Sequence, residues 1–273
     1  MKLPIPVFYH IPKNSGTYLY NCILGEIRKI NKNAHVIRVI DGQHILAKIV
    51  INSDLSLFGD KLTPINNTNI ARNLNVSDLT EDLLEHLSVI FVSVEARGFR
   101  RLNDSLKLLF LVLSKSVLHK FIILREPFSR EQSLYNYLTS EKSKHEQTHN
   151  IFKSPSFEEH VMSKQLQDSW IIRVLSDIPA GTTTLTEEQF NKACNFLETM
   201  ETYDINQTDK AIQDVLSKCF NVNNFDPHKI GSSKMNKNTY NKIKFNELSL
   251  DAQTRFNNHK YLDQQLYNRF MNK

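Results

Sequence analysis

The chain has 273 residues, and 34 Lys and Arg against 29 Asp and Glu give it a formal net charge of +5. Hydrophobic residues make up 40% and charged residues 23%, which excludes a disordered, collagen-like or coiled-coil chain as the main architecture. A chain of this length can bury a full core, and no Pro/Gly/Ser-rich linker divides it, so we expect one domain over residues 1–273.

Neither a membrane span nor a metal site is expected. The longest apolar run, residues 106–113, is interrupted by Lys107 and falls far short of the roughly 20 residues that a membrane-spanning helix needs. The N-terminal segment lacks the continuous apolar stretch and cleavage site of a secretory signal. The three cysteines show no CxxC spacing, which indicates reduced, mostly buried thiols and no zinc site. These features predict a cytoplasmic protein.

The first informative segment begins with the short apolar run of residues 7–11, which predicts a strand. The PKNSGT segment after it predicts a loop, and the apolar residues that follow recur at helical spacing. The loop therefore ends on a helix N-terminus, where unpaired N–H groups and a partial positive charge favour an anion. Gly16 lets the backbone approach a ligand closely, while Lys13, Ser15 and Thr17 supply a charge and hydroxyl donors.

This loop differs from the Walker pattern GxxxxGK[ST], because Lys13 precedes the single glycine by three positions. The segment HIPKNSGTYL, residues 10–19, resembles instead the 5′-phosphosulfate loop of the carbohydrate sulfotransferases, whose usual form is close to HIPKTGGTTL. A strand-to-helix turn with an incidental surface lysine is the alternative. The resemblance implies nucleotide contacts from Pro12, Lys13, Asn14, Ser15, Gly16, Thr17 and Tyr18.

The resemblance also points to a base for the acceptor hydroxyl. Many relatives use a histidine in a strand and turn similar to GHxxxG, and the corresponding residues 89–98 place Glu95 at that position. A carboxylate can serve as a base when burial raises its pKa, as in sulfotransferases that act on tyrosine. Glu95 is therefore the first candidate and His10 the second. The alternatives are an ion pair of Glu95 with a nearby arginine and simple packing of His10 at the strand end.

A second element begins with the apolar run HKFIIL of residues 119–124, which predicts a buried strand. Ser129 and Gln132 have the spacing of a capping box, so a helix is predicted to begin at Ser129. Arg125 leaves the strand end and Ser133 stands early in the helix. The planar fork of an arginine donates two hydrogen bonds to a phosphate, so both side chains can converge on one phosphate.

The segment LREPFSREQSLYNYL resembles the 3′-phosphate element of the same family, typically LRDPxxRxxSxYxY, and preserves its Arg-to-Ser spacing of eight. Glu126 replaces the usual Asp, a change that we expect to be harmless. An ordinary strand-end ion pair of Arg125 and Glu126 is the alternative. With both elements present, the resemblance implies binding of 3′-phosphoadenosine 5′-phosphosulfate through Arg125 and Ser133.

The resemblance extends weakly over nearly the whole chain. Residues 168–175 look like the family's mid-chain helix, a further helix starts at residues 185–188, and the segment from Asp263 to Tyr267 is similar to the family's D-x-x-L-Y ending. The loop of residues 229–237 has a composition able to fold over a nucleotide, although a plain surface loop is the alternative. The expected contacts there are Ser233, Lys234 and Lys237. Most of the remaining lysines are expected to lie on the solvated surface.

These observations predict an α/β protein with a P-loop-like three-layer fold, in which helices flank a central, mostly parallel sheet. The resemblance implies a soluble, bacterial-type member of the family, similar to the heparan sulfate 2-O- and 6-O-sulfotransferases, because the loop lies too near Met1 for an anchor. It would move a sulfuryl group by in-line displacement to a hydroxyl, with a glycan as the expected acceptor, and Lys13 would stabilise the leaving oxygen. The chemistry requires no metal.

Two alternative functions stay open. The chain could be a tyrosine or peptide sulfotransferase, or a non-catalytic nucleotide-binding protein of the same fold that has lost its base. A small P-loop nucleotide kinase is disfavoured by the position of Lys13. The basic excess forms no aromatic-interleaved stripe, so no nucleic-acid partner is expected.

Overall fold

The computed structural model describes the chain in segments, which are residues 3–31, 35–40, 43–49, 62–64, 87–93, 117–139, 155–164, 166–176, 178, 184–226 and 242–272. The chain divides into two compact units. Unit 1 comprises residues 1–123 and 197–237, and unit 2 comprises residues 124–196 and 238–273.

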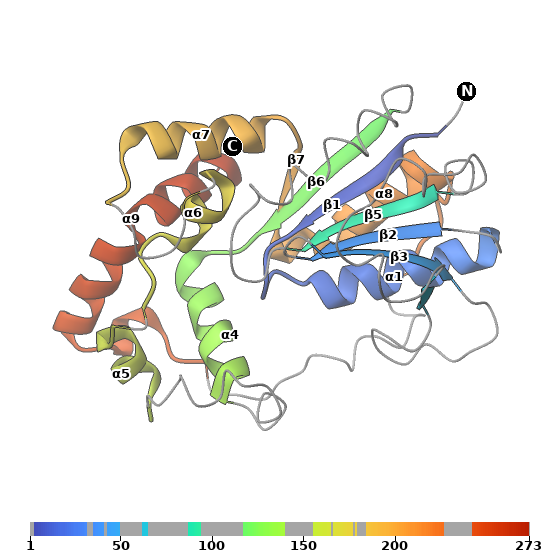
Figure 1. Ribbon diagram of the computed structural model, residues 1–273. Helices are drawn as coiled ribbons and strands as arrows, with labels where there is room; N and C mark the ends of the chain where they lie inside the picture. The colour runs from blue at the N-terminus through green and yellow to red at the C-terminus, as the bar shows by residue number, and fades with distance from the viewer. Residues whose placement is uncertain are drawn as a thin grey trace. The chain divides into compact units, whose positions relative to one another are not determined.

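Unit 1 is built on a seven-stranded sheet with the order β4-β3-β2-β5-β1-β6-β7 (Figure 1). The strands β2, β5, β1 and β6 run parallel to one another, whereas β3 pairs antiparallel with β2, and β4 antiparallel with β3. The predicted central, mostly parallel sheet is confirmed. The bounds are β1 (Ile5–His10), β2 (His35–Ile40), β3 (Gln43–Ile49), β4 (Leu62–Pro64), β5 (Leu87–Ser93), β6 (Leu118–Leu124) and β7 (Glu201–Asp204).

Strand β1 is an interior strand of the sheet. It lies between β5 and β6, with Phe8 opposite Phe91 on one side and Phe121 on the other. Because all three strands are parallel, the segments that follow them begin at the same edge of the sheet, where open α/β sheets bind their ligands. The predicted strands at residues 7–11 and 119–124 are confirmed as β1 and β6.

Helices α1 (Gly16–Ile30) and α8 (Thr208–Phe220) cover one face of the sheet. A 3-10 turn, η5 (Ile205–Gln207), leads into α8. The apolar face predicted for α1 is confirmed, since Leu19, Cys22, Ile23 and Ile27 are buried, but Ile30 ends the helix and is 51% exposed. Sheet and helices share one apolar core, and the α/β class is confirmed. Its strand members are Phe8, Val36, Val89, Phe121, Ile123 and Tyr203, and its α8 members are Ala211, Ile212, Val215, Leu216 and Cys219.

Unit 2 is helical. It contains α4 (Pro127–Thr139), α5 (Phe157–Met162), α6 (Trp170–Ser176), most of α7 (Glu187–Glu198), the 3-10 turn η8 (Phe245–Glu247) and α9 (Leu250–Met271). Its core is rich in aromatic rings, and Phe128 of α4 makes edge-on contacts with Phe157, Phe245 and Phe256 at centroid distances of 5.2–5.5 Å. Edge-to-face pairs of this kind favour one arrangement of the rings, so the aromatic core orients α4.

Within the described part of the chain, no helix is long and apolar enough to cross a membrane. The same residues contain no group of three or more His, Cys, Asp or Glu that could hold a metal ion. Cys22, Cys194 and Cys219 are buried thiols that form no disulfide, as predicted. Burial raises the pKa of the Cys219 thiol to about 12.

A polar cluster lies beside the first residues of β6. The His119 Nδ1 atom is 3.8 Å from Glu201 Oε1, and the same carboxylate accepts hydrogen bonds from Lys218 and from the Tyr203 hydroxyl. Burial lowers the pKa of His119, and Glu201 opposes this effect only in part. His119 is therefore neutral in the folded protein around pH 7.

Acid is expected to destabilise unit 1 through His119. Since its folded-state pKa lies below the ordinary value of 6.5, the unfolded chain takes up this proton first as the pH falls. The free energy of unfolding should therefore decrease below about pH 6.5 and level off once the pH passes the folded-state pKa. Urea unfolding of the parent protein and of His119→Gln between about pH 5 and about pH 7 tests this. The free energy of unfolding of the variant should depend less on pH. Equal slopes in both proteins would contradict the assignment.

Candidate functional site

The predicted phosphate loop connects the central strand β1 to helix α1. Ile11 after the strand is fully buried, and the backbone N–H of Asn14 donates to the Ile11 carbonyl at 3.2 Å, which closes a turn. Helix α1 begins at Gly16, with Ser15 as its N-cap residue. The observed strand, loop and helix are those expected from HIPKNSGTYL, and they have the order found in phosphate-binding P-loop motifs.

Two residues of the loop have left-handed backbone conformations. Lys13 has φ of 71° and Ser15 has φ of 58°, a region that costs a residue with a Cβ about 1–2 kcal/mol. Residues held in such conformations cluster at functional sites, where the surrounding structure stabilises them. The carbohydrate sulfotransferase motif has glycine at the position of Ser15, which is the residue that this backbone favours.

Ser15→Gly is expected to raise the free energy of unfolding by about 0.5–1 kcal/mol. Glycine removes the Cβ penalty at φ of 58°, and the greater freedom of glycine in the unfolded chain offsets part of this gain. Urea unfolding measures the difference. Ser15→Ala is the matched control, because it removes the hydroxyl but keeps the Cβ and should bring no gain. A Ser15→Gly protein less stable than Ser15→Ala would show that the left-handed conformation is not strained.

Asn14 links the loop to the neighbouring strand. Its side chain is fully buried, and Nδ2 donates a hydrogen bond of 2.8 Å to the backbone carbonyl of Ile123 near the end of β6. The loop after β1 is thereby attached to the strand that leads to Arg125. Asn14 stands between Lys13 and Ser15, so this hydrogen bond fixes the part of the loop in which both residues have left-handed conformations.

His10 packs directly against Gly16. A Cβ atom placed on Gly16 would lie 2.1 Å from His10 Nε2 and 2.2 Å from His10 Cδ2, well inside contact distance. The glycine is therefore required here to make room for the imidazole ring, which stands at the start of helix α1. His10, the second candidate base, is thus part of the structure of the loop.

The first turn of α1 has the electrostatic character of an anion site. No acidic residue lies in this turn, and the Ser15 side chain makes no capping hydrogen bond to it. Helix N-termini usually carry one or the other. Tyr18, a predicted nucleotide contact, donates its hydroxyl to Asp209 of α8 at 2.7 Å, and burial together with this bond raises its pKa. Tyr18 therefore joins the two helices that cover the sheet.

The second predicted element, the segment that follows β6, belongs to unit 2. Arg125 follows β6, and its Nε donates to the Ser129 hydroxyl at 2.9 Å. The prediction that the helix begins at Ser129 is wrong, because α4 already begins at Pro127. Glu126 caps it, accepting hydrogen bonds from the backbone N–H groups of Phe128 and Ser129 at 2.9 and 2.7 Å. Proline suits the first helical position, and the side chain of Glu126 caps the helix in place of Ser129.

The predicted site residues therefore fall in two groups. His10, Pro12, Lys13, Asn14, Ser15, Gly16 and Tyr18 form one loop and helix start in unit 1, while Arg125 and Ser133 belong to α4 and its entry in unit 2. Glu95 lies outside the described residues, two positions after the last residue of β5. Ser233, Lys234 and Lys237 and the side chain of Thr17 also lie outside them.

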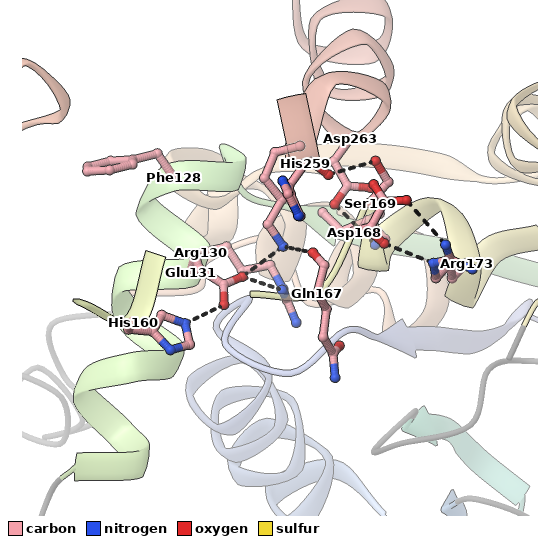
Figure 2. A network of polar contacts seen from close by, with 12 residues as sticks. Phe128, Arg130, Glu131, His160, Gln167, Asp168, Ser169, Arg173, His259 and Asp263 are labelled. Carbon is pink, nitrogen blue, oxygen red and sulfur yellow. Dashed lines mark hydrogen bonds and ion pairs between the residues drawn. The ribbon is translucent and has the colours of Figure 1, made fainter. Parts of the chain in front are cut away.

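A buried charge cluster in unit 2 was not predicted from the sequence. Figure 2 shows Glu131 of α4 among polar side chains that include Arg130 of the same helix and His160 of α5. Its carboxylate lies 3.0 Å from Lys260 Nζ of α9 and 3.0 Å from His160 Nε2 of α5. Lys260 is only 2% exposed, so it is an exception among the lysines, most of which were expected to lie on the solvated surface.

Two further charges complete this cluster, which we call the α4 charge cluster and define as Arg130, Glu131, His160, Lys260 and Asp263. Arg130 lies 3.8 Å from the Glu131 carboxylate and stacks over the Trp170 ring at 4.1 Å. Asp263, the first residue of the D-x-x-L-Y ending, accepts hydrogen bonds from the backbone N–H groups of Ile171 and Ile172 at 3.3 and 3.0 Å. It therefore caps the N-terminus of α6, which gives that ending a structural role.

No family model and no curated protein sequence matches the chain. Two similar solved structures are the mouse sulfotransferase SULT7A1 in complex with PAP and a putative cell surface hydrolase from Lactobacillus plantarum. The first is 12% identical, covers 99% of this chain and 85% of its own, and has a TM-score of 0.39. The second is 10% identical, covers 86% of this chain and 97% of its own, and has a TM-score of 0.26. Both TM-scores are below 0.5, so the assignment of the fold rests on the strand order and pairing.

Proposed function

We propose that this protein is a sulfotransferase that moves the sulfuryl group of 3′-phosphoadenosine 5′-phosphosulfate to an acceptor hydroxyl, with both units acting as one domain. The loop between β1 and α1 carries the proposal. It presents Lys13 and an α1 N-terminus that has no acidic residue in its first turn and no side-chain cap, at the centre of a parallel sheet. This is the arrangement that binds phosphates in α/β proteins.

The second support is the segment after β6. Arg125 and Ser133 keep the spacing of the 3′-phosphate element, and β6 is the parallel neighbour of β1, so both motifs follow strands that end at one edge of the sheet. A nucleotide with phosphates at its 5′ and 3′ positions needs two anion sites. We infer that the loop receives the 5′-phosphosulfate and that Arg125 and Ser133 receive the 3′-phosphate.

The proposed reaction is a single in-line displacement at sulfur. The acceptor oxygen forms a bond to sulfur while the bond from sulfur to the 5′-phosphate oxygen breaks, and 3′-phosphoadenosine 5′-phosphate leaves. The proton of the acceptor hydroxyl passes to Glu95, with His10 as the alternative base. Lys13 and the α1 N-terminus stabilise the negative charge that develops on the bridging oxygen, the type of electrostatic effect that usually contributes most to catalysis.

The acceptor proposed from the family resemblance is a glycan hydroxyl, with a tyrosine or peptide hydroxyl as the alternative. Isothermal titration with 3′-phosphoadenosine 5′-phosphate and transfer of labelled sulfate to glycan and peptide acceptors test the proposal. We expect binding and transfer to one acceptor class. Binding without transfer to either class would favour a non-catalytic nucleotide-binding protein, and absence of binding would contradict the nucleotide site.

A further inference from the structure

The α4 charge cluster lies on the same helix as the proposed 3′-phosphate contact. Glu131 and Ser133 are two residues apart in α4, and the Arg125 guanidinium is bound to Ser129 of the same helix. Packed helices move as rigid bodies. A contact that fixes Glu131 therefore also fixes Ser133 and, through Ser129, Arg125. Lys260 makes the closest charged contact to Glu131 from outside α4 together with His160.

The contact between Lys260 and Glu131 is buried, which makes it costly to break. Glu131 is 3% exposed and Lys260 is 2% exposed, and Lys260 Nζ also donates to the Gln167 carbonyl at 2.6 Å. Buried charges must keep their partners, because an unpaired charge in the interior is far more costly than one at the surface. Lys260 therefore holds α4, α9 and the segment before α6 in one arrangement.

The cluster holds two basic residues, Arg130 and Lys260, and two acidic residues, Glu131 and Asp263. Burial raises the pKa of Asp263. Burial alone would raise the pKa of Glu131, but Lys260, His160 and Arg130 lower it by more, so that the pKa lies well below its ordinary value. Glu131 is consequently ionised at neutral pH, and its attraction to Lys260 is that of two full charges.

We propose that Lys260 is a positioning residue for the 3′-phosphate of the nucleotide, acting through Glu131 on Ser133 of α4 and on Arg125, which is bound to Ser129 of the same helix. This inference rests on the proposed function. It assigns a role in nucleotide selection to a lysine that lies in none of the sequence motifs.

The test compares two nucleotides that differ only in the 3′-phosphate. 3′-Phosphoadenosine 5′-phosphate and adenosine 5′-phosphate are titrated into the full-length parent protein and into Lys260→Met, each shown to be folded by circular dichroism. In the variant, the preference for the 3′-phosphorylated nucleotide should fall about tenfold, the effect of one misplaced charge-assisted hydrogen bond, while the affinity for adenosine 5′-phosphate stays unchanged. A general loss of structure would weaken both.

Lys192→Met is the matched control. Lys192 lies in α7 of the same unit and pairs with Glu188 at 2.7 Å, but both side chains are more than half exposed, so the preference should remain that of the parent. Glu131→Gln serves as a second variant if Lys260→Met does not fold, because glutamine keeps the shape and removes the charge. Its preference for the 3′-phosphate should also fall.

The outcomes separate the two proposals. A parent protein with no preference for the 3′-phosphorylated nucleotide would overturn the proposed 3′-phosphate site itself. A parent with this preference, combined with an unchanged preference in a folded Lys260→Met or Glu131→Gln protein, would overturn only the role of Lys260. Equal weakening of both nucleotides in the variant would also overturn it, because Lys260 would then be merely structural.

Discussion

Lys13→Met is expected to reduce kcat for sulfuryl transfer by about 10²–10³-fold, the loss that follows removal of one preorganised group beside a developing negative charge. Binding of 3′-phosphoadenosine 5′-phosphate should weaken much less, because the α1 N-terminus and the 3′-phosphate element would still hold the nucleotide. Methionine keeps most of the length of the side chain without its charge. The measurements are steady-state transfer of labelled sulfate and isothermal titration with the nucleotide product.

The matched control for this charge is Lys29→Met. Lys29 lies at the far end of α1, is exposed, and pairs with Glu26 on the helix surface at 2.6 Å, so its removal should leave kcat at the parent value. If Lys13→Met keeps the parent kcat, Lys13 has no part in the reaction. If both variants lose activity equally, net charge rather than position explains the effect.

Gly16→Ala is expected to disrupt the phosphate loop, lowering the free energy of unfolding by about 1–3 kcal/mol, as overpacking of a close contact does. The new methyl group would lie 2.1 Å from His10 Nε2, so either the imidazole leaves its place or α1 shifts away from β1. Both movements change the position of Lys13, and affinity for 3′-phosphoadenosine 5′-phosphate should fall together with stability. Urea unfolding and isothermal titration measure the two losses.

Two further proteins make this prediction specific. Gly25→Ala lies in the same helix, and a Cβ there meets nothing within 4 Å, so alanine should stabilise the protein slightly through its higher helix propensity. The double variant His10→Ala, Gly16→Ala removes the ring that the methyl group would strike and should regain most of the lost stability. Failure of the double variant to recover would show that His10 is not the cause of the requirement for glycine.

Short-range sequence patterns were sufficient to predict β1, α1 and β6. Each depends on residues close together in the chain, an apolar run for a strand or helical spacing for α1. The antiparallel pair of β2 and β3 was not predicted, although Asp41 and Gly42 stand between them and this dipeptide is a strong signal for a two-residue hairpin turn.

The start of α4 shows where local rules compete. Ser129 and Gln132 satisfy the capping-box pattern, but Glu126 and Pro127 also carry helix-start signals, and the structure places the start at Pro127. The glutamate carboxylate reaches two backbone N–H groups, which is more than a single hydroxyl acceptor at Ser129 could satisfy.

The amino-acid sequence by itself predicted two phosphate-binding motifs, because each motif consists of contiguous residues whose conformation depends on near neighbours. Only the tertiary structure decided what holds them. The hydrogen bond from Asn14 to Ile123 joins residues 109 positions apart, and the contact of Lys260 with Glu131 joins two different helices. A lysine is buried or solvated according to which charges the fold brings beside it, so the net charge of +5 could not distinguish Lys260 from the surface lysines.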